Sequence, residues 1–352
     1  MLAFGGVTPK LYGWDLAIVR AGARLIFAGA DPYDADAMSR VLGNPALARF
    51  PFAYPPNVAL DVAPLVALPN LVALAVLAAF GAVALRAALK ERALVVTASF
   101  PALAAFASGQ LVWIPLAVFA AVRALLARDR ALAAGMVASL LAFKPTMLAF
   151  VPIALAFSSS RVRALAGLAI GVVAQLLACL AIAPGALRAY PDAARAFSAY
   201  VASHPALFDS VTWRSALSSD ALGAIAIVAV GIVAVAWMWR ARRDLDALMS
   251  ACVLATLACA WHCLPYDYVL LALPFAWLAD RLDARDRARI GAALVASSWL
   301  ALLPGRAHFV VLALFPGALV VTGAWMMVAS RSWRQSGPHE QDGSRAPASP
   351  RA

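Results

Sequence analysis

Long apolar runs separated by short charged breaks dominate the pattern of this chain. Each run is about 15 to 25 residues long, the length of a helix that satisfies its own backbone hydrogen bonds in lipid. The pattern therefore predicts an all-α, polytopic membrane protein. The runs cover residues 58–85, 93–107, 111–127, 132–157, 164–183, 216–239, 245–262, 267–280, 290–304 and 308–329.

One run contains a charge and a helix breaker in its middle. Lys144 and Pro145 interrupt residues 132–157, and Pro145 removes a backbone donor from the helix. If the chain turns there, most of the 29 Lys and Arg residues fall on one side of the membrane, as the positive-inside rule requires. We therefore expect about eleven transmembrane helices, several of them short or half-length.

This topology predicts three regions. Residues 1–57 form an outer loop with a short amphipathic helix near Leu16–Ala28, and residues 58–329 form the transmembrane domain. Residues 330–352, rich in Pro, Ser, Gly and charge, have the composition of a disordered tail, which we place on the cytoplasmic side. The outer face then carries polar turns, which suggests an outward-facing polar cavity. These segments are Met1–Phe52, Gly109-Gln110, Lys144-Pro145, Pro184–Arg214 and His262–Asp267.

Composition excludes a water-soluble protein. The chain is 64% apolar and 13% charged, whereas soluble domains carry about 25% charged residues. The net charge of +11 follows from basic residues at helix ends, so we expect no nucleic-acid partner. Four cysteines in or beside apolar runs predict no disulfide framework. Cys259, His262 and Cys263 are close in sequence but lack further metal ligands nearby, so we assign no metal site.

The amino-terminal region supplies the first candidate site residues. Asp15 precedes a predicted helix on which Arg20 and Arg24 share a face, and its alternative role is a helix N-cap. The segment Asp31–Asp34 has the composition of a turn. Tyr54 precedes two prolines and should be extended.

Charged and polar residues in or beside the apolar runs supply the rest. Asp61 is either a functional intramembrane carboxylate or a residue that reaches the helix end. Gln110 and Lys144 lie at turns, and Lys144 suits either a phosphate or a carboxylate partner. His262 and Asp267 bracket a Pro-containing turn among aromatic residues, a combination that favours function over a simple aromatic belt.

Five segments together resemble glycosyltransferase family 87. They occur in family order over about residues 12 to 275, each weak alone and moderately specific as a set. The resemblance implies the C-type glycosyltransferase fold and a polyprenyl-phosphate sugar donor, with mannosyltransferases the best-known members. The segments are WDLAIVRAGARLIFAGADPYD, FAYPPNVALDVAPLVALP, Gly109-Gln110, AFKPTMLAFVPIAL and PYDYVLLALP.

The resemblance also implies roles for particular residues. Asp15 matches the first-loop Asp that acts as catalytic base in such enzymes, and Asp267 matches the Asp of their YD motif. His262 lies in the late outer loop, where members place polar active-site residues. We assign Lys144 to the donor phosphate. The family fold begins with a membrane helix, and Asp15 comes fourteen residues after Met1, which leaves open whether such a helix precedes it.

These observations give one expected function and two alternatives. We expect single displacement with inversion, in which a hexose (mannose is the expected sugar) passes from a polyprenyl-phosphate sugar to a lipid or envelope-glycan acceptor. The site would face the outside of a bacterial-type plasma membrane and use no cofactor. Arg20, Arg24, Gln110 and Tyr54 would help to bind donor or acceptor. The alternatives are a transporter or flippase of a lipid-linked or anionic solute, and a scaffold for envelope assembly.

Overall fold

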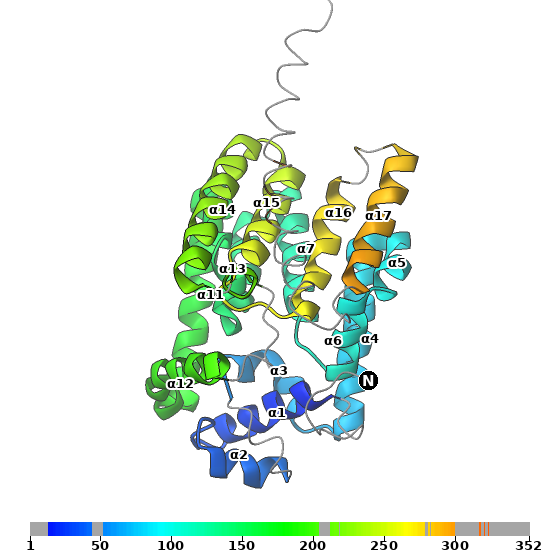
Figure 1. The fold of residues 1–352 in the computed structure, drawn as a ribbon. Helices are drawn as coiled ribbons and strands as arrows, with labels where there is room; N and C mark the ends of the chain where they lie inside the picture. Colours follow the sequence, from blue (N-terminus) through cyan, green and yellow to red (C-terminus); the bar gives the residue numbers. More distant parts are fainter. Residues whose placement is uncertain are drawn as a thin grey trace, which may run out of the picture.

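The computed structural model of this protein describes residues 13–43, 52–203, 212–217, 219–278, 281 and 283–299, with single positions at 317, 320 and 323. These described residues form helices, turns and loops, with no strand among them. Figure 1 shows a bundle of upright helices and, across its lower end, a second group that we call the end layer. The end layer consists of α1 (Trp14–Phe27), α2 (Ala35–Leu42), α3 (Val58–Val66) and α12 (Pro184–Ser203).

The described residues include three helical stretches long and apolar enough to cross a membrane, which are Asn70–Thr97, Arg161–Ile182 and Asp220–Ala241. The first comprises α4 (Asn70–Leu89), η1 (Lys90–Arg92) and α5 (Ala93–Thr97), and the others are α11 and α14. A fourth is present if α6 (Phe100–Ser108) and α7 (Trp113–Ala127), bent by 119° at their junction, form one span. The predicted total of about eleven membrane helices, together with the C-type fold, stays a prediction.

Shorter helices complete the bundle around these spans. Two of them, α15 (Leu245–Ala258) and α16 (Ala272–Leu278), flank a 3₁₀ helix, η3 (Pro265–Leu271), which contains the PYDYVLL segment. The remaining elements are α8 (Ala131–Ala138), η2 (Ser139–Phe143), α9 (Pro145–Leu148), α10 (Val151–Phe157), α13 (Trp213–Leu217) and α17 (Ala284–Ser298).

The predicted break at Lys144-Pro145 is confirmed. The helical segment Ala131–Phe143 ends before Lys144, whose φ of −131° and ψ of 85° lie outside the helical region. A new segment starts at Pro145. Proline disfavours helical geometry at the residue before it, and its fixed φ suits the first position of the next helix. Lys144 is thereby placed at a turn between two short helices.

One apolar run and one predicted loop fold differently from what the sequence predicts. Residues 58–85 do not form one helix, because α3 ends at Val66 and Pro69 is extended before α4 starts at Asn70. The predicted outer loop 184–214 contains a 20-residue helix, α12. Its less exposed positions include Ala186, Tyr190 and Phe197, which follow helical spacing. Alanine-rich amphipathic sequence therefore forms a helix where the chain is not apolar enough for lipid.

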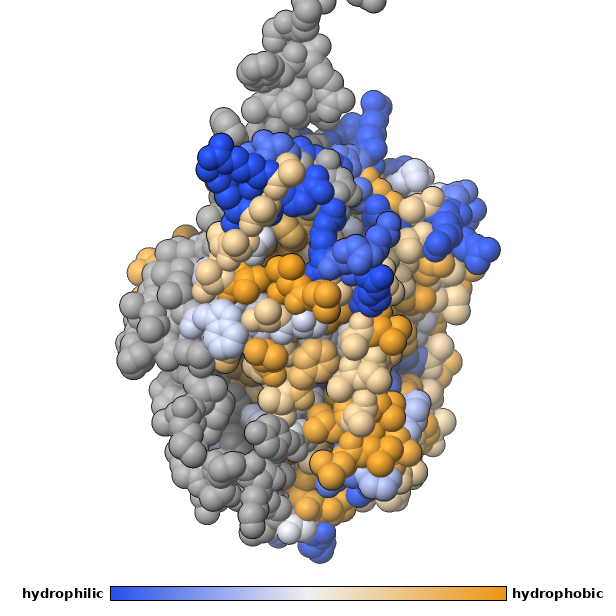
Figure 2. Space-filling model, turned by 90° about the vertical axis from the view of Figure 1, so that its right-hand side faces the viewer, coloured by the Kyte–Doolittle hydropathy of each residue, from blue (hydrophilic) through white to orange (hydrophobic). Residues whose placement is uncertain are grey.

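The charged breaks meet at the bundle end away from the end layer. Arg281 pairs with Asp244 at 2.7 Å, and Arg123 pairs with Asp246 at 2.6 Å. The guanidinium of Arg92 donates to the carbonyl of Ala276 at 3.0 Å. Figure 2 shows hydrophilic residues gathered at this upper end above a broad apolar zone. This distribution is the one expected of helices whose basic ends share one side of a membrane.

Some predicted segments fall outside the described residues. They are residues 1–12 and 44–51 of the predicted outer loop, residues 204–211 of the Pro184–Arg214 segment, residues 300–304 of the run 290–304, most of the run 308–329 and the whole tail 330–352.

Close helix packing in the bundle depends on glycines between α8 and α11. A Cβ on Gly135 would lie 1.9 Å from the Ala164 carbonyl oxygen, and one on Gly167 would lie 2.0 Å from the Leu132 carbonyl oxygen. The two backbones are therefore in direct contact, as is common where small residues pack between apolar helices.

Candidate functional site

The amino-terminal end of α1 is fixed against the end of α6. The Gly13 amide donates to the Ala107 carbonyl at 2.8 Å, and Gly13 and Gly109 both adopt left-handed φ values of 75° and 71°. A Cβ on Gly109 would lie 3.2 Å from the Gly13 Cα, so glycine permits this close approach. Asp15 is consequently held beside the α6–α7 turn.

Asp15 is not the N-cap of its helix, because Gly13 occupies that position. Its carboxylate instead accepts a hydrogen bond from the side-chain amide of Gln110, which is buried in the α6–α7 turn. Two candidates that lie 95 residues apart in the sequence are thus direct partners.

Lys144 and Asp267 form a second direct pair. The Lys144 Nζ lies 2.6 Å from an Asp267 carboxylate oxygen, and the side chains are 21% and 1% exposed. The other Asp267 oxygen accepts from the Leu264 amide at 3.1 Å, which fixes the turn into η3. The Lys144 Nζ also lies 5.7 Å from the centre of the Tyr266 ring. Of the two partners considered for Lys144, a phosphate and a carboxylate, the structure shows a carboxylate.

The two pairs share one electrostatic environment. Burial raises the pKa of Asp15, in the end layer, from 3.8 to about 7. Contacts with Gln110 and Ser108 and the charge of Lys144 lower this pKa, while the charge of Asp267 raises it. Asp15 therefore titrates near neutral pH, where a general base works best.

Tyr54 lies at the same site. Its ring stacks on Phe143 with centroids 6.3 Å apart, and its carbonyl accepts from the Tyr33 hydroxyl at 3.0 Å. Burial and then the charges of Asp15 and Asp267 raise the pKa of Tyr54. Its hydroxyl stays protonated at physiological pH and is available to a substrate as a donor.

His262 lies in the loop between α15 and η3, which runs over the bundle end that faces the end layer (Figure 1). Burial and the charges of Lys144 and Arg214 lower the pKa of His262 to about 4, against an opposing effect of Asp267. The imidazole is consequently neutral at pH 7. Its ring contacts Phe197 of α12 edge-on, with centroids 5.8 Å apart.

Arg20 and Arg24 lie elsewhere. Arg20 is buried, and its guanidinium donates to the Leu65 carbonyl at 2.8 Å and to the carbonyl of Leu68. Arg24 donates to the Val66 carbonyl at 3.0 Å. Both arginines satisfy carbonyls at the end of α3 and so join α3 to α1. We do not include them in the site.

Of the remaining acidic candidates, Asp31 and Asp34 make local hydrogen bonds, and Asp61 has no assigned role. Asp31 accepts from the Tyr33 amide at 2.9 Å, and Asp34 caps α2 by accepting from two backbone amides, which confirms the predicted turn. Asp61 lies in α3, and its buried Oδ2 makes no hydrogen bond to any residue that the structure describes. Within the described ranges, no group of three or more His, Cys, Asp or Glu side chains is arranged to hold a metal ion.

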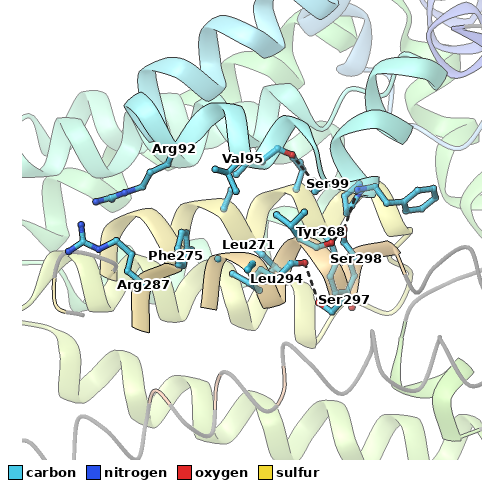
Figure 3. A pocket seen from close by; sticks show the side chains of 18 of the residues that line it. Arg92, Val95, Ser99, Tyr268, Leu271, Phe275, Arg287, Leu294, Ser297 and Ser298 are labelled. Carbon is cyan, nitrogen blue, oxygen red and sulfur yellow. Dashed lines mark hydrogen bonds between the residues drawn. The ribbon is translucent and has the colours of Figure 1, made fainter. Parts of the chain in front are cut away.

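A mainly apolar cavity of about 510 Å³ begins beside this site. It lies between α5 and α6 on one side and η3, α16 and α17 on the other. Figure 3 shows Tyr268 and Ser298 at one end and Arg92 and Arg287 at the other. Pro265 and Tyr268 line the first end and flank Asp267 in the sequence, so the cavity extends from the polar site towards the charged end of the bundle.

Sequence reasoning missed Arg214. Its guanidinium carbon lies 4.1 Å from the centre of the Trp261 ring, next to His262. The sequence marks this residue only as an arginine just before the apolar run 216–239. An arginine at that place is ordinary at a helix end, so the sequence did not single it out as a site residue.

Comparison with known proteins identifies the family of the chain. No curated protein and no solved structure matches the chain. The sequence model of glycosyltransferase family 87 matches residues 52–265. This range includes Tyr54, Gln110, Lys144 and His262; Asp267 lies two residues beyond it, and Asp15 lies well before its start. Since the match covers more than half of the chain, the protein belongs to glycosyltransferase family 87 and is a membrane glycosyltransferase.

Proposed function

We propose that this enzyme transfers a hexose, with mannose as the expected sugar, from a polyprenyl-phosphate sugar to a hydroxyl of a lipid or envelope-glycan acceptor. Family membership supports glycosyl transfer, the site supports the roles of the residues, and the sugar and acceptor are those that the family resemblance implies. The decisive observation is a carboxylate, Asp15, that is held by Gln110 next to the Lys144–Asp267 pair and has a pKa of about 7. Such a group is matched to proton abstraction at neutral pH.

The proposed reaction is a single displacement. Asp15 removes the proton of the acceptor hydroxyl, and the acceptor oxygen forms a bond to the anomeric carbon. The bond from that carbon to the phosphate oxygen breaks, and the phosphate leaves with the electron pair. Because one carboxylate acts as base and no covalent sugar–enzyme bond forms, the anomeric configuration inverts.

Lys144 is the proposed partner of the leaving phosphate. A lysine ammonium carries three donors, of which one binds Asp267, so further donors are available to a phosphate oxygen. Positive charge held where negative charge develops lowers the barrier to departure. Phosphate is already a good leaving group, so the mechanism needs no strong general acid. Tyr54 and His262 are positioned to bind hydroxyls of donor or acceptor.

The apolar cavity supports a lipid-linked donor. Its end at Pro265 and Tyr268 adjoins Asp267 of the polar site, and its volume of about 510 Å³ is bounded mainly by apolar side chains. An isoprenoid chain placed there would leave its phosphate near Asp267 and Lys144. The cavity thus joins a site for charge to a site for hydrocarbon, as a polyprenyl-phosphate sugar requires.

The distribution of charge supports a site on the outer face of a bacterial-type plasma membrane. The basic breaks gather at the bundle end opposite α1, and such ends are cytoplasmic under the positive-inside rule. Asp15, Lys144, His262 and Asp267 would then face outward together. This grouping at one end favours an enzyme over a transporter, whose polar residues should line a path to both faces.

The donor class is tested by comparing two donors with purified wild-type enzyme and a membrane extract as acceptor. We expect transfer from synthetic polyprenyl-phosphate mannose, none from a nucleotide-linked mannose, and a product whose anomeric configuration is opposite to that of the donor. Transfer from the nucleotide sugar alone would contradict the proposed donor, and retained configuration would contradict the single displacement.

A further inference from the structure

A second cation, Arg214, lies at the loop that carries His262 and leads to the Lys144–Asp267 pair. Arg214 belongs to α13, a short helix that precedes the long apolar helix α14. Its guanidinium carbon lies 4.1 Å from the Trp261 ring centre, so the two planar groups stack closely. The loop that carries Trp261 and His262 is therefore in contact with Arg214.

The guanidinium is held in place from a second side. Its Nε and Nη2 atoms lie 2.8 and 2.7 Å from one carboxylate oxygen of Asp220. The Arg214 side chain is 26% exposed, whereas that of Asp220 is 75% exposed. Asp220 therefore positions the guanidinium, while solvent screens its own negative charge. A guanidinium oriented by stacking and by an ion pair loses little freedom when it binds an anion.

The charges that face His262 give this place a positive potential. Lys144 and Arg214 both act on the imidazole as cations, and Asp267 is the opposing anion. Asp267 is paired with Lys144, and Phe197, which contacts the imidazole edge-on, is apolar. The imidazole is neutral at pH 7 and so adds no charge of its own.

We propose that Arg214, at the Trp261 end of the loop 261–267, and Lys144, at its Asp267 end, bind one phosphate group beside His262. The planar fork of Arg214 fits two phosphate oxygens, and Lys144 contributes a point charge. This proposal rests on the proposed function if the phosphate is that of the polyprenyl-linked donor. The same chemistry would serve a phosphate carried by an acceptor lipid, and the experiment distinguishes these sources.

The test combines binding and kinetics for wild type, Arg214→Gln and Arg214→Lys. Arg195→Gln is the matched control, because Arg195 is an exposed arginine of α12 that pairs with Asp192. Binding of polyprenyl phosphate, the proposed product, is measured directly, so the readout does not depend on turnover. We expect Arg214→Gln to weaken this binding about tenfold or more, the effect of a lost charge-assisted hydrogen bond. Arg214→Lys should fall between it and wild type.

The kinetic constants identify the source of the phosphate. A rise in KM for the donor with an unchanged KM for the acceptor supports the donor phosphate, and the reverse supports a phosphate-bearing acceptor. Equal binding of polyprenyl phosphate by wild type and Arg214→Gln, with both KM values unchanged, overturns the inference while leaving a transferring enzyme intact. A wild type that neither transfers nor binds polyprenyl phosphate would overturn the proposed function itself. If Arg214→Gln does not fold, Arg214→Lys carries the same comparison.

Discussion

The clearest consequence of the site is that Gln110 sets the pH at which the enzyme becomes active. Burial raises the pKa of Asp15 to about 7, and the hydrogen bond from Gln110 is the strongest influence that opposes this rise. Asp15 must be ionised to act as base, so activity should be lost as the pH falls through about 7. Gln110→Leu removes the donor that stabilises the ionised form and should move this loss to higher pH.

The size of the movement follows from the strength of the bond. A hydrogen bond to a charged group contributes about 1.5 to 3 kcal/mol. Since about 1.4 kcal/mol corresponds to one pKa unit, we expect the acidic limb of Gln110→Leu to lie about 1 to 2 pH units above that of wild type. The activity remaining at high pH should approach that of wild type, because the base itself is unchanged.

The assay is kcat/KM for sugar transfer between about pH 5 and 9, which reports the pKa of the free enzyme. The phosphodiester of the donor does not titrate in this range. Gln175→Leu is the control, because Gln175 donates to Ser139 and accepts from Asn57 rather than binding Asp15. The reasoning would be refuted if the kcat/KM of wild type fell only near pH 4, or if the acidic limb of the pH profile were the same in Gln110→Leu as in wild type.

Two predictions concern stability in detergent. Arg20→Ala should lower the free energy of unfolding by about 3 kcal/mol, because it leaves buried carbonyls at the end of α3 without donors. Arg24→Ala, at an exposed position, should lower it little, and equal thermal midpoints for the two variants would contradict this prediction. Gly167→Ala should destabilise by about 1 to 3 kcal/mol or prevent folding, because its Cβ would meet the α8 backbone, while Gly185→Ala has open space and should be neutral or better. A Gly167→Ala protein as stable as Gly185→Ala would show that α8 and α11 are not packed as described.

Local signals in the sequence predicted the local structure well. Pro145 interrupts its helix because a proline acts on the residues next to it, and Asp31 and Asp34 form a turn through their own neighbouring amides. The helix at 16–28 was also expected, and it spans Trp14–Phe27. Each of these outcomes depends on residues within a few positions of one another.

Features that depend on distant residues were only partly accessible. The topology placed Gln110 and Lys144 on the same face as Asp15, but their partners could not be deduced, because the contacts Asp15–Gln110 and Lys144–Asp267 join residues 95 and 123 positions apart. Arg20 looked like a site residue, yet its direction is decided by the carbonyls of α3, which no sequence spacing reveals.

The division between lipid-facing and surface helices was also hard to deduce. Apolar composition made residues 58–85 look like one span, although Pro69 separates a short end-layer helix from the long one. The helix α12 was hidden because amphipathic, alanine-rich sequence satisfies neither the pattern of a span nor that of a loop.

The most direct test of the account is sugar transfer from synthetic polyprenyl-phosphate mannose by wild type, Asp15→Asn and Asp36→Asn. Asp36 is an exposed carboxylate of α2 and serves as the matched control. Because the pKa of Asp15 is raised from 3.8 to about 7 in the folded state, the fold loses stability as the pH rises between these two values and keeps that loss at higher pH. Asp15→Asn removes this loss and should therefore unfold at the same or a higher temperature than wild type at pH 8.

We predict transfer by wild type and Asp36→Asn and a loss of about 10²- to 10⁴-fold in a folded Asp15→Asn protein, the usual contribution of a general base. Transfer by Asp15→Asn within a few-fold of wild type would contradict the central claim that Asp15 is the catalytic base.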